Sequence, residues 1–420
     1  MKTDHESAEL AKYELEFTSP EEAGFNPDSL KKIDEMIMEY VDQKLFPGAV
    51  VLLAKEGKII YETEVGWSDS LQTEPYRKDH IFRLASMTKP FTSVAALQLM
   101  EKGKLNLNEP ISKYIPEFAD PKVMVSFNKE DTTWESRLAD REPTVANLLN
   151  QTAGVPYGFM NPPVFEAMLT KAGIPDLATH LDVTLEEKMA VLAGLPLIHD
   201  PGERWMYGLN TDVLGRVVEI ASGQNLSEYV DEHISQPLGI KDMNFFLKEE
   251  QAPRLVDVYI AGKDNVIHYL PPQEPFYIPN YPAEGAKSYY SGGSGLNGTA
   301  RDYFRFCQAV LDDGKFGEAQ ILKSETAQMM HASQIDTLTY PWGPFKFGYG
   351  FDIADGHSTR PDGTYSWGGA FSTMFWIDPE NEIIGIMLSQ VLFAPDGSMS
   401  DRFEEMVYNS LIDEKEVAIN

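Results

Sequence analysis

Residues 83–100 of the chain read RLASMTKPFTSVAALQLM. The apolar residues recur at helical spacing, so we predict a helix that begins next to Ser86. Lys89 lies three residues after Ser86, which places both side chains on one face of that helix. A lysine removed from water can take the proton of a serine hydroxyl and make it a nucleophile. The spacing therefore predicts nucleophilic chemistry, although a capped surface helix fits the same string.

The charge and composition limit the partners that the chain can have. The 420 residues include 35 Lys and Arg against 65 Asp and Glu, a formal net charge of −30. This field repels nucleic acid and anionic membranes, so we expect neither as a partner. A single cysteine, Cys307, excludes an intrachain disulfide, and no stretch is apolar enough to span a bilayer. The first residues lack the apolar core of a secretory signal, so we expect a cytoplasmic protein.

Strand-like runs lie near both ends of the chain. A helix is predicted to begin at Asn26. Two apolar runs, 49–54 and 59–61, flank a glycine turn and predict a hairpin, and the runs at 371–377 and 383–388 predict another. Helical patterns and long loops fill the middle of the chain, so the sheet is expected to join the two ends.

We therefore predict an α+β fold of two lobes. Residues 21–100 and 291–420 form an α/β sandwich lobe with an antiparallel sheet built from both chain ends. Residues 101–290 form an inserted all-helical lobe, in which the acidic stretch 117–142 is irregular. Residues 1–20 form a loose N-terminal segment. The cleft between the lobes is the natural place for a site.

Two further stretches could supply the groups that acyl transfer by a serine requires. Tyr207 lies just before a predicted helix, where a phenol can relay a proton. Trp367-Gly368-Gly369 begins a late strand, where glycines let a backbone N–H approach a substrate oxygen. The simpler interpretations are that Tyr207 only packs at a lobe boundary and that Trp367-Gly368-Gly369 only forms a hairpin bend.

Together, these three stretches resemble the motifs of serine beta-lactamase-like hydrolases and are most similar to the bacterial carboxylesterases of family VIII. The resemblance covers nearly the whole chain after about residue 20. Further segments that match in order are 103–107, 114–118, 148–154, 236–240 and 293–302. The resemblance implies a serine beta-lactamase/DD-peptidase-like fold that works without a metal or another cofactor.

The resemblance also assigns roles to individual residues. It makes Ser86 the acylated nucleophile, Lys89 its base partner and Tyr207 an aid to proton transfer. It leaves open whether Lys89 or Tyr207 takes the first proton. The backbone N–H groups of Ser86 and Ala370 would form the oxyanion hole.

Two departures from the family pattern bear on the substrate. Trp367 stands where penicillin-recognising relatives carry a lysine or histidine, and an indole offers no full positive charge to a beta-lactam carboxylate. Leu209 breaks the family's Tyr-x-Asn, and Asn210 stands one place late. We expect Asn210 to line the substrate pocket with Trp367, Gly368 and Gly369. Both departures favour esters over beta-lactams.

The sequence thus predicts a serine carboxylesterase that hydrolyses short-chain, small-molecule esters through an acyl-enzyme. Three alternatives remain: a beta-lactamase or D-amino-acid peptidase, an acyltransferase, and an inactive penicillin-binding-like sensor. The chain has no Gly-x-Ser-x-Gly, which disfavours an α/β-hydrolase. Scattered histidines disfavour a metal site. The aromatic residues of 269–290 could line the acyl pocket or pack elsewhere. The sequence does not determine the oligomeric state.

Overall fold

An eight-stranded sheet forms the framework of the computed structural model, with the strands in the order β1-β3-β2-β16-β15-β14-β13-β12. The structure describes residues 13–128, 130–160, 164–272, 277–335, 338, 346–356, 360–394 and 397–412. The strands of this sheet are β1 (Glu16–Phe17), β2 (Gly48–Lys55), β3 (Lys58–Gly66), β12 (Lys346–Phe347), β13 (Asp352–Ile353), β14 (Tyr365–Gly369), β15 (Thr373–Asp378) and β16 (Ile383–Leu388).

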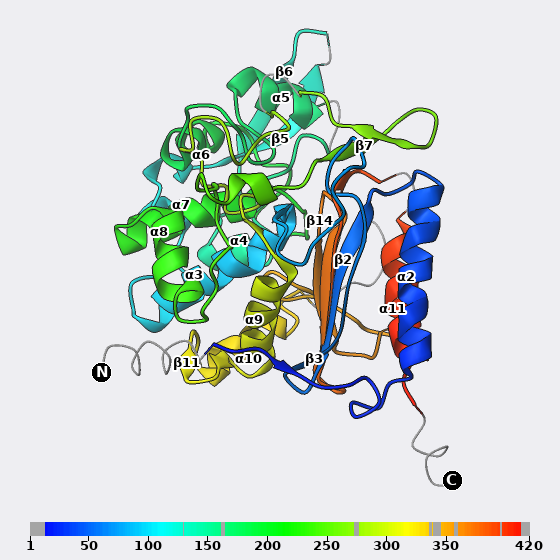
Figure 1. Ribbon diagram of the computed structural model, residues 1–420. Coiled ribbons are helices and arrows are strands. Elements are labelled where there is room, and N and C mark those ends of the chain that lie inside the picture. The colour runs from blue at the N-terminus through cyan, green and yellow to red at the C-terminus, as the bar shows by residue number, and fades with distance from the viewer. Residues whose placement is uncertain are drawn as a thin grey trace.

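The sheet joins the two ends of the chain, as predicted. β2 pairs with β3 on one side and with β16 on the other, so that Leu52 lies opposite Glu62 and Ile386. Figure 1 shows the blue N-terminal strands beside the orange C-terminal ones. All these neighbours are antiparallel except β1, which runs parallel to β3. The predicted α+β fold class is confirmed.

Helices cover both faces of the sheet, which explains why β2 and β16 are almost entirely buried and read as continuous apolar runs. α2 (Pro27–Asp42) and α11 (Ser398–Asn409) lie side by side on one face (Figure 1). The predicted start of α2 is confirmed, because the Asn26 side chain accepts a hydrogen bond of 3.0 Å from the Ser29 N–H. Both helices pack apolar side chains against the sheet.

The other face carries α9 (Ala300–Leu311) and, beyond it, the helical region that holds the candidate site (Figure 1). α3 (Lys89–Glu101) lies within that region, packs against α7 and is almost completely buried. The other helices are α4 (Val145–Leu149), α5 (Val164–Ala172), α6 (Leu185–Ala193), α7 (Asn210–Ser222), α8 (Leu226–Val230) and α10 (Ser324–His331).

The inserted region is not all-helical, and that expectation is wrong. Within 117–142, β5 (Lys122–Asn128) and β6 (Thr133–Leu138) form an antiparallel hairpin. β7 (Tyr259–Ala261) and β8 (Ile267–Tyr269) form a second one. Most of the β5–β6 hairpin is exposed, so no clear hydrophobic alternation marks it in the sequence.

The N-terminal segment also departs from expectation. β1 lies within the stretch 1–20 that we expected to be loose, and residues 1–12 lie outside the described residues. Its pairing with β3 ties the start of the described chain to the edge of the sheet.

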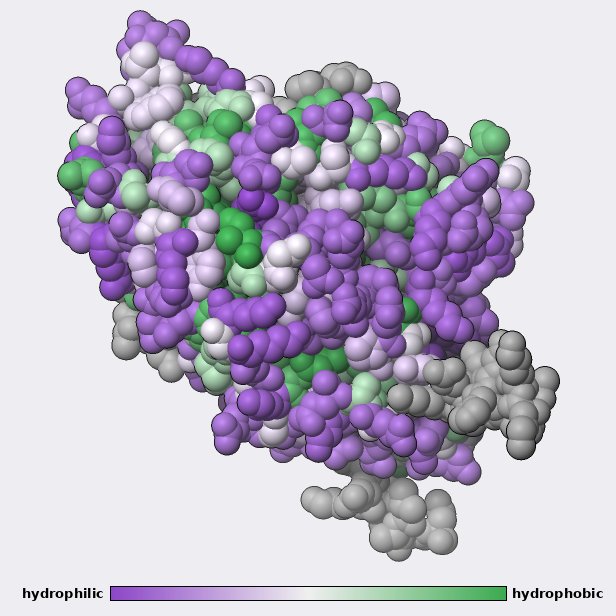
Figure 2. Space-filling view, turned by 90° about the vertical axis from the view of Figure 1, so that its left-hand side faces the viewer, coloured by the Kyte–Doolittle hydropathy of each residue, from purple (hydrophilic) through white to green (hydrophobic). Residues whose placement is uncertain are grey.

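The surface agrees with the acidic composition. Figure 2 shows a face on which hydrophilic residues dominate and hydrophobic ones gather in small, separate patches. Within the described ranges, no helix is both long enough and apolar enough to cross a bilayer.

Candidate active site

Ser86 lies in a tight turn between the two regions. β4 (Phe82–Arg83) pairs with β9 (Asn297–Gly298), and the 3-10 turn η1 (Ala85–Thr88) leads from β4 into α3. The Thr88 hydroxyl donates to the Ala85 carbonyl (2.6 Å) and accepts from the Leu296 N–H (2.9 Å). Ala85 has φ of 45°, a left-handed conformation that is strained for a residue with a Cβ. Strain of this kind, held by surrounding contacts, is typical of functional sites.

The structure brings Lys89 against Ser86. Lys89 is the first residue of α3 and its side chain is 1% exposed. Its Nζ donates to Ser86 Oγ (3.1 Å), to the Gly293 carbonyl (2.9 Å) and to Tyr157 Oη (3.0 Å). These three contacts hold the amine in one orientation beside the hydroxyl.

Tyr207 also lies beside Lys89, and it faces the amine with its ring. Its ring centroid lies 4.5 Å from Lys89 Nζ, a cation–π distance, while its hydroxyl accepts a 3.2 Å hydrogen bond from Trp367 Nε1. The structure therefore brings Tyr207, Lys89 and Trp367 together, with the ring of Tyr207, rather than its oxygen, facing the amine.

Sequence reasoning missed Tyr157, the tyrosine that accepts the hydrogen bond from Lys89. Its ring packs edge-on against Tyr207 with centroids 5.3 Å apart. Burial raises the pKa of Tyr157 well above its ordinary value, so the side chain remains a neutral phenol at neutral pH. The only signal was the sequence Gly154-Val155-Pro156-Tyr157-Gly158, a turn rich in Gly and Pro.

Two carboxylates, the half-buried Asp176 and the buried Asp212, support this cluster. Asp176 accepts hydrogen bonds from the N–H groups of Gly158 (2.8 Å) and Phe159 (3.1 Å), which fixes the loop that carries Tyr157. Burial raises the pKa of Asp176 to about 6. Asp212 accepts a 2.6 Å hydrogen bond from the Ser291 hydroxyl. Burial also raises the pKa of Asp212, while the nearby Lys89 ammonium opposes that shift.

The end of β14 lies directly against the turn that carries Ser86. A Cβ on Gly369 would stand 2.3 Å from the Leu84 carbonyl oxygen and 2.2 Å from Thr373 Oγ1. Only glycine therefore allows this approach. The approach places Ala370 beside Ser86 on one cavity, so their N–H groups remain the candidates for the oxyanion hole.

A cavity of about 450 Å³ unites most of the predicted site residues. Its walls include Ser86, Tyr207, Trp367, Gly368, Gly369 and Ala370. Asn210 is not among its lining residues, contrary to our expectation. That residue is completely buried, and its amide donates to Gln151 Oε1 (2.8 Å) and to the Met206 carbonyl (3.3 Å). These hydrogen bonds let Asn210 brace the loop before α7. Because its side chain is completely buried, Asn210 cannot contact a substrate in the cavity.

The aromatic residues of 269–290 pack behind the site. Tyr277 and Tyr281 are buried in a cluster with Ala85 and Phe371. Among the described residues of this stretch, none lines the Ser86 cavity. Phe276 lies outside the described residues. Tyr277 and Tyr281 therefore support the nucleophile turn from outside the cavity.

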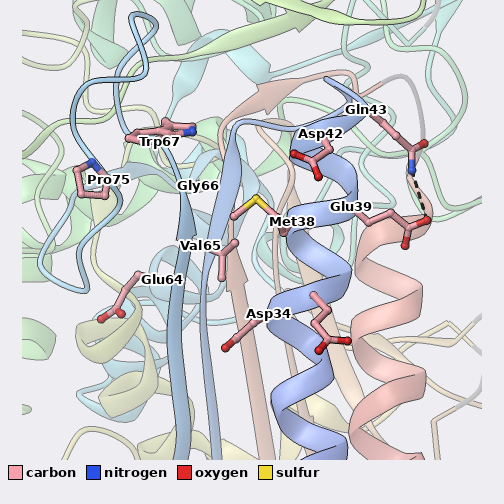
Figure 3. Close-up of a pocket in the computed structure, with 11 residues that line it drawn as sticks. Asp34, Met38, Glu39, Asp42, Gln43, Glu64, Val65, Gly66, Trp67 and Pro75 are labelled. Carbon is pink, nitrogen blue, oxygen red and sulfur yellow. Dashed lines mark hydrogen bonds between the residues drawn. The ribbon is translucent and has the colours of Figure 1, made fainter.

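A larger groove of about 870 Å³ lies elsewhere, between α2, β3 and the loop that follows β3 (Figure 3). Its lining residues include Asp34, Glu39 and Asp42 of α2, and the Glu39 side chain turns toward Gln43 (Figure 3). This groove shares no lining residue with the Ser86 cavity, and none of its described lining residues is a serine, cysteine or lysine. The smaller cavity is therefore the candidate active site.

The Beta-lactamase family model matches residues 33–405. The chain belongs to the Beta-lactamase family. The predicted resemblance is thereby confirmed at the level of the family, whose members related to this chain include hydrolases and acyltransferases.

Individual relatives of this Beta-lactamase family protein match it along most of their length. It is 29% identical to esterase EstB from Burkholderia gladioli, over 90% of this chain and 94% of that protein. It is 27% identical to the ML-236A carboxylate methylbutanoyltransferase mlcH from Penicillium citrinum, over 88% of this chain and 92% of that one. Among solved structures, EstCE1, a hydrolase with promiscuous acyltransferase activity, superposes with a TM-score of 0.75 at 28% identity, covering 91% and 99% of the two chains.

Proposed function

We propose that this protein is a serine carboxylesterase that hydrolyses carboxylic esters through an acyl-enzyme on Ser86. The observation that carries the proposal is the 3.1 Å contact between Lys89 Nζ and Ser86 Oγ, inside a buried cluster that opens onto a cavity. A serine alcohol needs a base at this distance to become a nucleophile.

The contacts support a two-step reaction. Ser86 Oγ attacks the ester carbonyl carbon while its proton passes to a deprotonated base, which is either the uncharged Lys89 amine or the Tyr207 phenolate. The oxyanion that develops accepts hydrogen bonds from the N–H groups of Ser86 and Ala370. The C–O bond to the alcohol then breaks, and the cluster returns the proton to the leaving oxygen. Water attacks the acyl-enzyme in the second step and releases the acid and Ser86.

The surroundings of the cavity favour an ester over a beta-lactam. A beta-lactam carboxylate needs a positive charge at the position of Trp367, and the indole N–H there already donates to Tyr207. Arg360, a cation on the cavity wall, pairs with Glu404 at 2.7 Å and with the Ser366 hydroxyl. A neutral ester needs neither charge, as in the family VIII carboxylesterases that the motifs resemble.

Replacement of the nucleophile tests the proposal. Ser86→Ala should lower hydrolysis of p-nitrophenyl acetate and butyrate by at least about a thousandfold. Ser93→Ala is the matched control, because Ser93 is also buried on the same helical segment and lies outside the Ser86 cavity. A fluorophosphonate probe should label the parent protein and Ser93→Ala, but not Ser86→Ala. Undiminished ester turnover in Ser86→Ala would reject the proposal, and failure of the probe to label the parent protein would favour an inactive sensor.

Acyl transfer to an alcohol is the second candidate function, because mlcH is named a methylbutanoyltransferase and EstCE1 combines both activities. The same acyl-enzyme serves both reactions, and only the attacking hydroxyl differs. Adding an alcohol acceptor to the assay and measuring the new ester against the free acid decides between them. Nitrocefin turnover that rivals ester turnover would instead favour a beta-lactamase.

A further inference from the structure

A second cavity adjoins the active site. It has a volume of about 300 Å³ and lies between the sheet and the start of α11. Phe46, Met374, Met387 and Ala394 supply apolar walls. None of its described lining residues is ionisable, whereas Asp352, Arg360 and Asp401 all line the Ser86 cavity. The second cavity is thus the apolar neighbour of a polar site.

The two cavities meet at the glycines of β14. Gly368, Gly369, Met374 and Ser400 line both of them. A Cβ on Gly368 would meet only the Thr373 carbonyl oxygen, at 3.3 Å, within a radius of 4 Å. Apart from this one contact, the side-chain position of Gly368 is unfilled, and Gly368 is one of the residues that line both cavities.

The strand geometry explains how one substrate could reach both faces of the sheet. Trp367 contacts Tyr207 on the Ser86 side, so Gly368, the next residue, faces the opposite side together with its cross-strand partner Met374. In the described residues, β13 pairs with β14 only as far as Ser366. The outer edge of β14 at Gly368 and Gly369 is therefore free of β13, and a chain can pass round it.

We propose that the second cavity is a subsite for a flexible alkyl chain of the ester substrate, reached from Ser86 around the free edge of Gly368 and Gly369. This inference rests on the proposed esterase function and extends its substrates from short-chain to medium-chain esters. The chain belongs either to the acyl group or to the alcohol, and both present the same methylene surface to the walls.

The walls of this subsite are already formed. Ser372 is the last residue of the connection between β14 and β15 and has φ of 60°, and its hydroxyl donates to the Val391 carbonyl at 2.8 Å. The Val391 N–H donates to the Phe371 carbonyl at 3.0 Å, and the Phe393 N–H donates to the Ala370 carbonyl at 3.3 Å. A preformed apolar cavity binds an alkyl chain without first ordering its own walls.

The chain-length profile of the unaltered enzyme is the first test. Each methylene buried should raise kcat/KM roughly fourfold until the cavity is full. Two series separate the two sources of the chain: p-nitrophenyl esters from acetate to decanoate, and alkyl acetates from methyl to octyl. A rise in the first series assigns the subsite to the acyl chain and a rise in the second to the alcohol. Flat profiles in both series would overturn the proposal.

Variants of the second cavity locate the effect. Ala394→Leu fills the cavity outside the walls of the Ser86 site, and Ala394→Ser is the control of similar size. With Ala394→Leu, turnover of the favoured long ester should fall more than tenfold while acetate turnover stays within twofold. Ala394→Ser should keep the parent profile. Met374→Ala enlarges the cavity, so the chain length with the highest kcat/KM should increase.

The outcomes distinguish this proposal from the proposed function. An acetate-active enzyme whose chain-length profile is unchanged in Ala394→Leu and Met374→Ala would refute the subsite and leave the esterase function intact. If Ala394→Leu fails to fold, as judged by circular dichroism, an unchanged profile in Met374→Ala refutes the subsite alone. A parent enzyme that hydrolyses none of these esters would remove both proposals.

Discussion

Replacing Tyr157 with phenylalanine tests the least expected contact in the site. The change removes one oxygen atom, which accepts a 3.0 Å hydrogen bond from Lys89 Nζ. The ring remains, with its centroid 5.2 Å from the amine, so the packing and the cation–π contact are kept. The substitution therefore removes the hydroxyl and keeps the ring.

The expected magnitude follows from the charge and burial of the contact. A hydrogen bond to a charged group contributes about 1.5–3 kcal/mol, and at about 1.4 kcal/mol for each factor of ten this predicts a loss of about 10- to 150-fold in kcat/KM. The loss should be the same for acetate and butyrate esters, because Tyr157 is not a lining residue of the cavity. Its measurement requires initial rates of p-nitrophenyl ester hydrolysis, together with a melting temperature to exclude unfolding.

Tyr289→Phe is the matched control. Tyr289 is also completely buried near the same cluster, and its hydroxyl has no hydrogen-bond partner among the described residues. It should keep kcat/KM within about twofold, since no bond to Lys89 is lost. If Tyr157→Phe is as active as Tyr289→Phe while Tyr207→Phe is impaired, the reasoning that Tyr157 orients Lys89 is refuted.

Three further perturbations follow from the same contacts. Trp367→Phe removes the N–H that donates to Tyr207 Oη at 3.2 Å and should lower kcat/KM by about two- to tenfold, in the same ester assay. Gly369→Ala should destabilise the fold by about 1–3 kcal/mol in urea denaturation, because its Cβ would overlap the Leu84 carbonyl, whereas Gly368→Ala should cost less, because its nearest contact is at 3.3 Å. Burial raises the pKa of Asp176 from 3.8 to about 6. Between these two pH values the folded state holds a proton on this carboxyl that the unfolded state has lost, so the free energy of unfolding rises as the pH falls. Relative to Asp176→Asn, the parent protein should gain about 1 kcal/mol of unfolding free energy between pH 7 and pH 5, and a constant difference would contradict that pKa.

The amino-acid sequence was sufficient wherever the geometry is local or the apolar pattern is long. The spacing of Ser86 and Lys89 predicted their contact, because three residues make nearly one helical turn. The hairpins at 49–61 and 371–388 were predicted because buried strands are rich in apolar residues and end at turns. Local sequence singled out Tyr207 and Trp367, the resemblance to the family then gave them roles, and the structure brings them together.

The remaining features depend on contacts between residues that are far apart in the chain. Tyr157 lies 68 residues from Lys89, and no periodicity links the two positions. Asn210 lies close to Tyr207 in the sequence, yet its side-chain amide donates a hydrogen bond to Gln151 inside the protein. The mostly exposed β5–β6 hairpin carries no clear pattern, because solvent accepts polar and apolar side chains in any order. Sequence spacing fixes what lies within a turn of helix, whereas packing of the whole chain decides which distant side chains share a cavity.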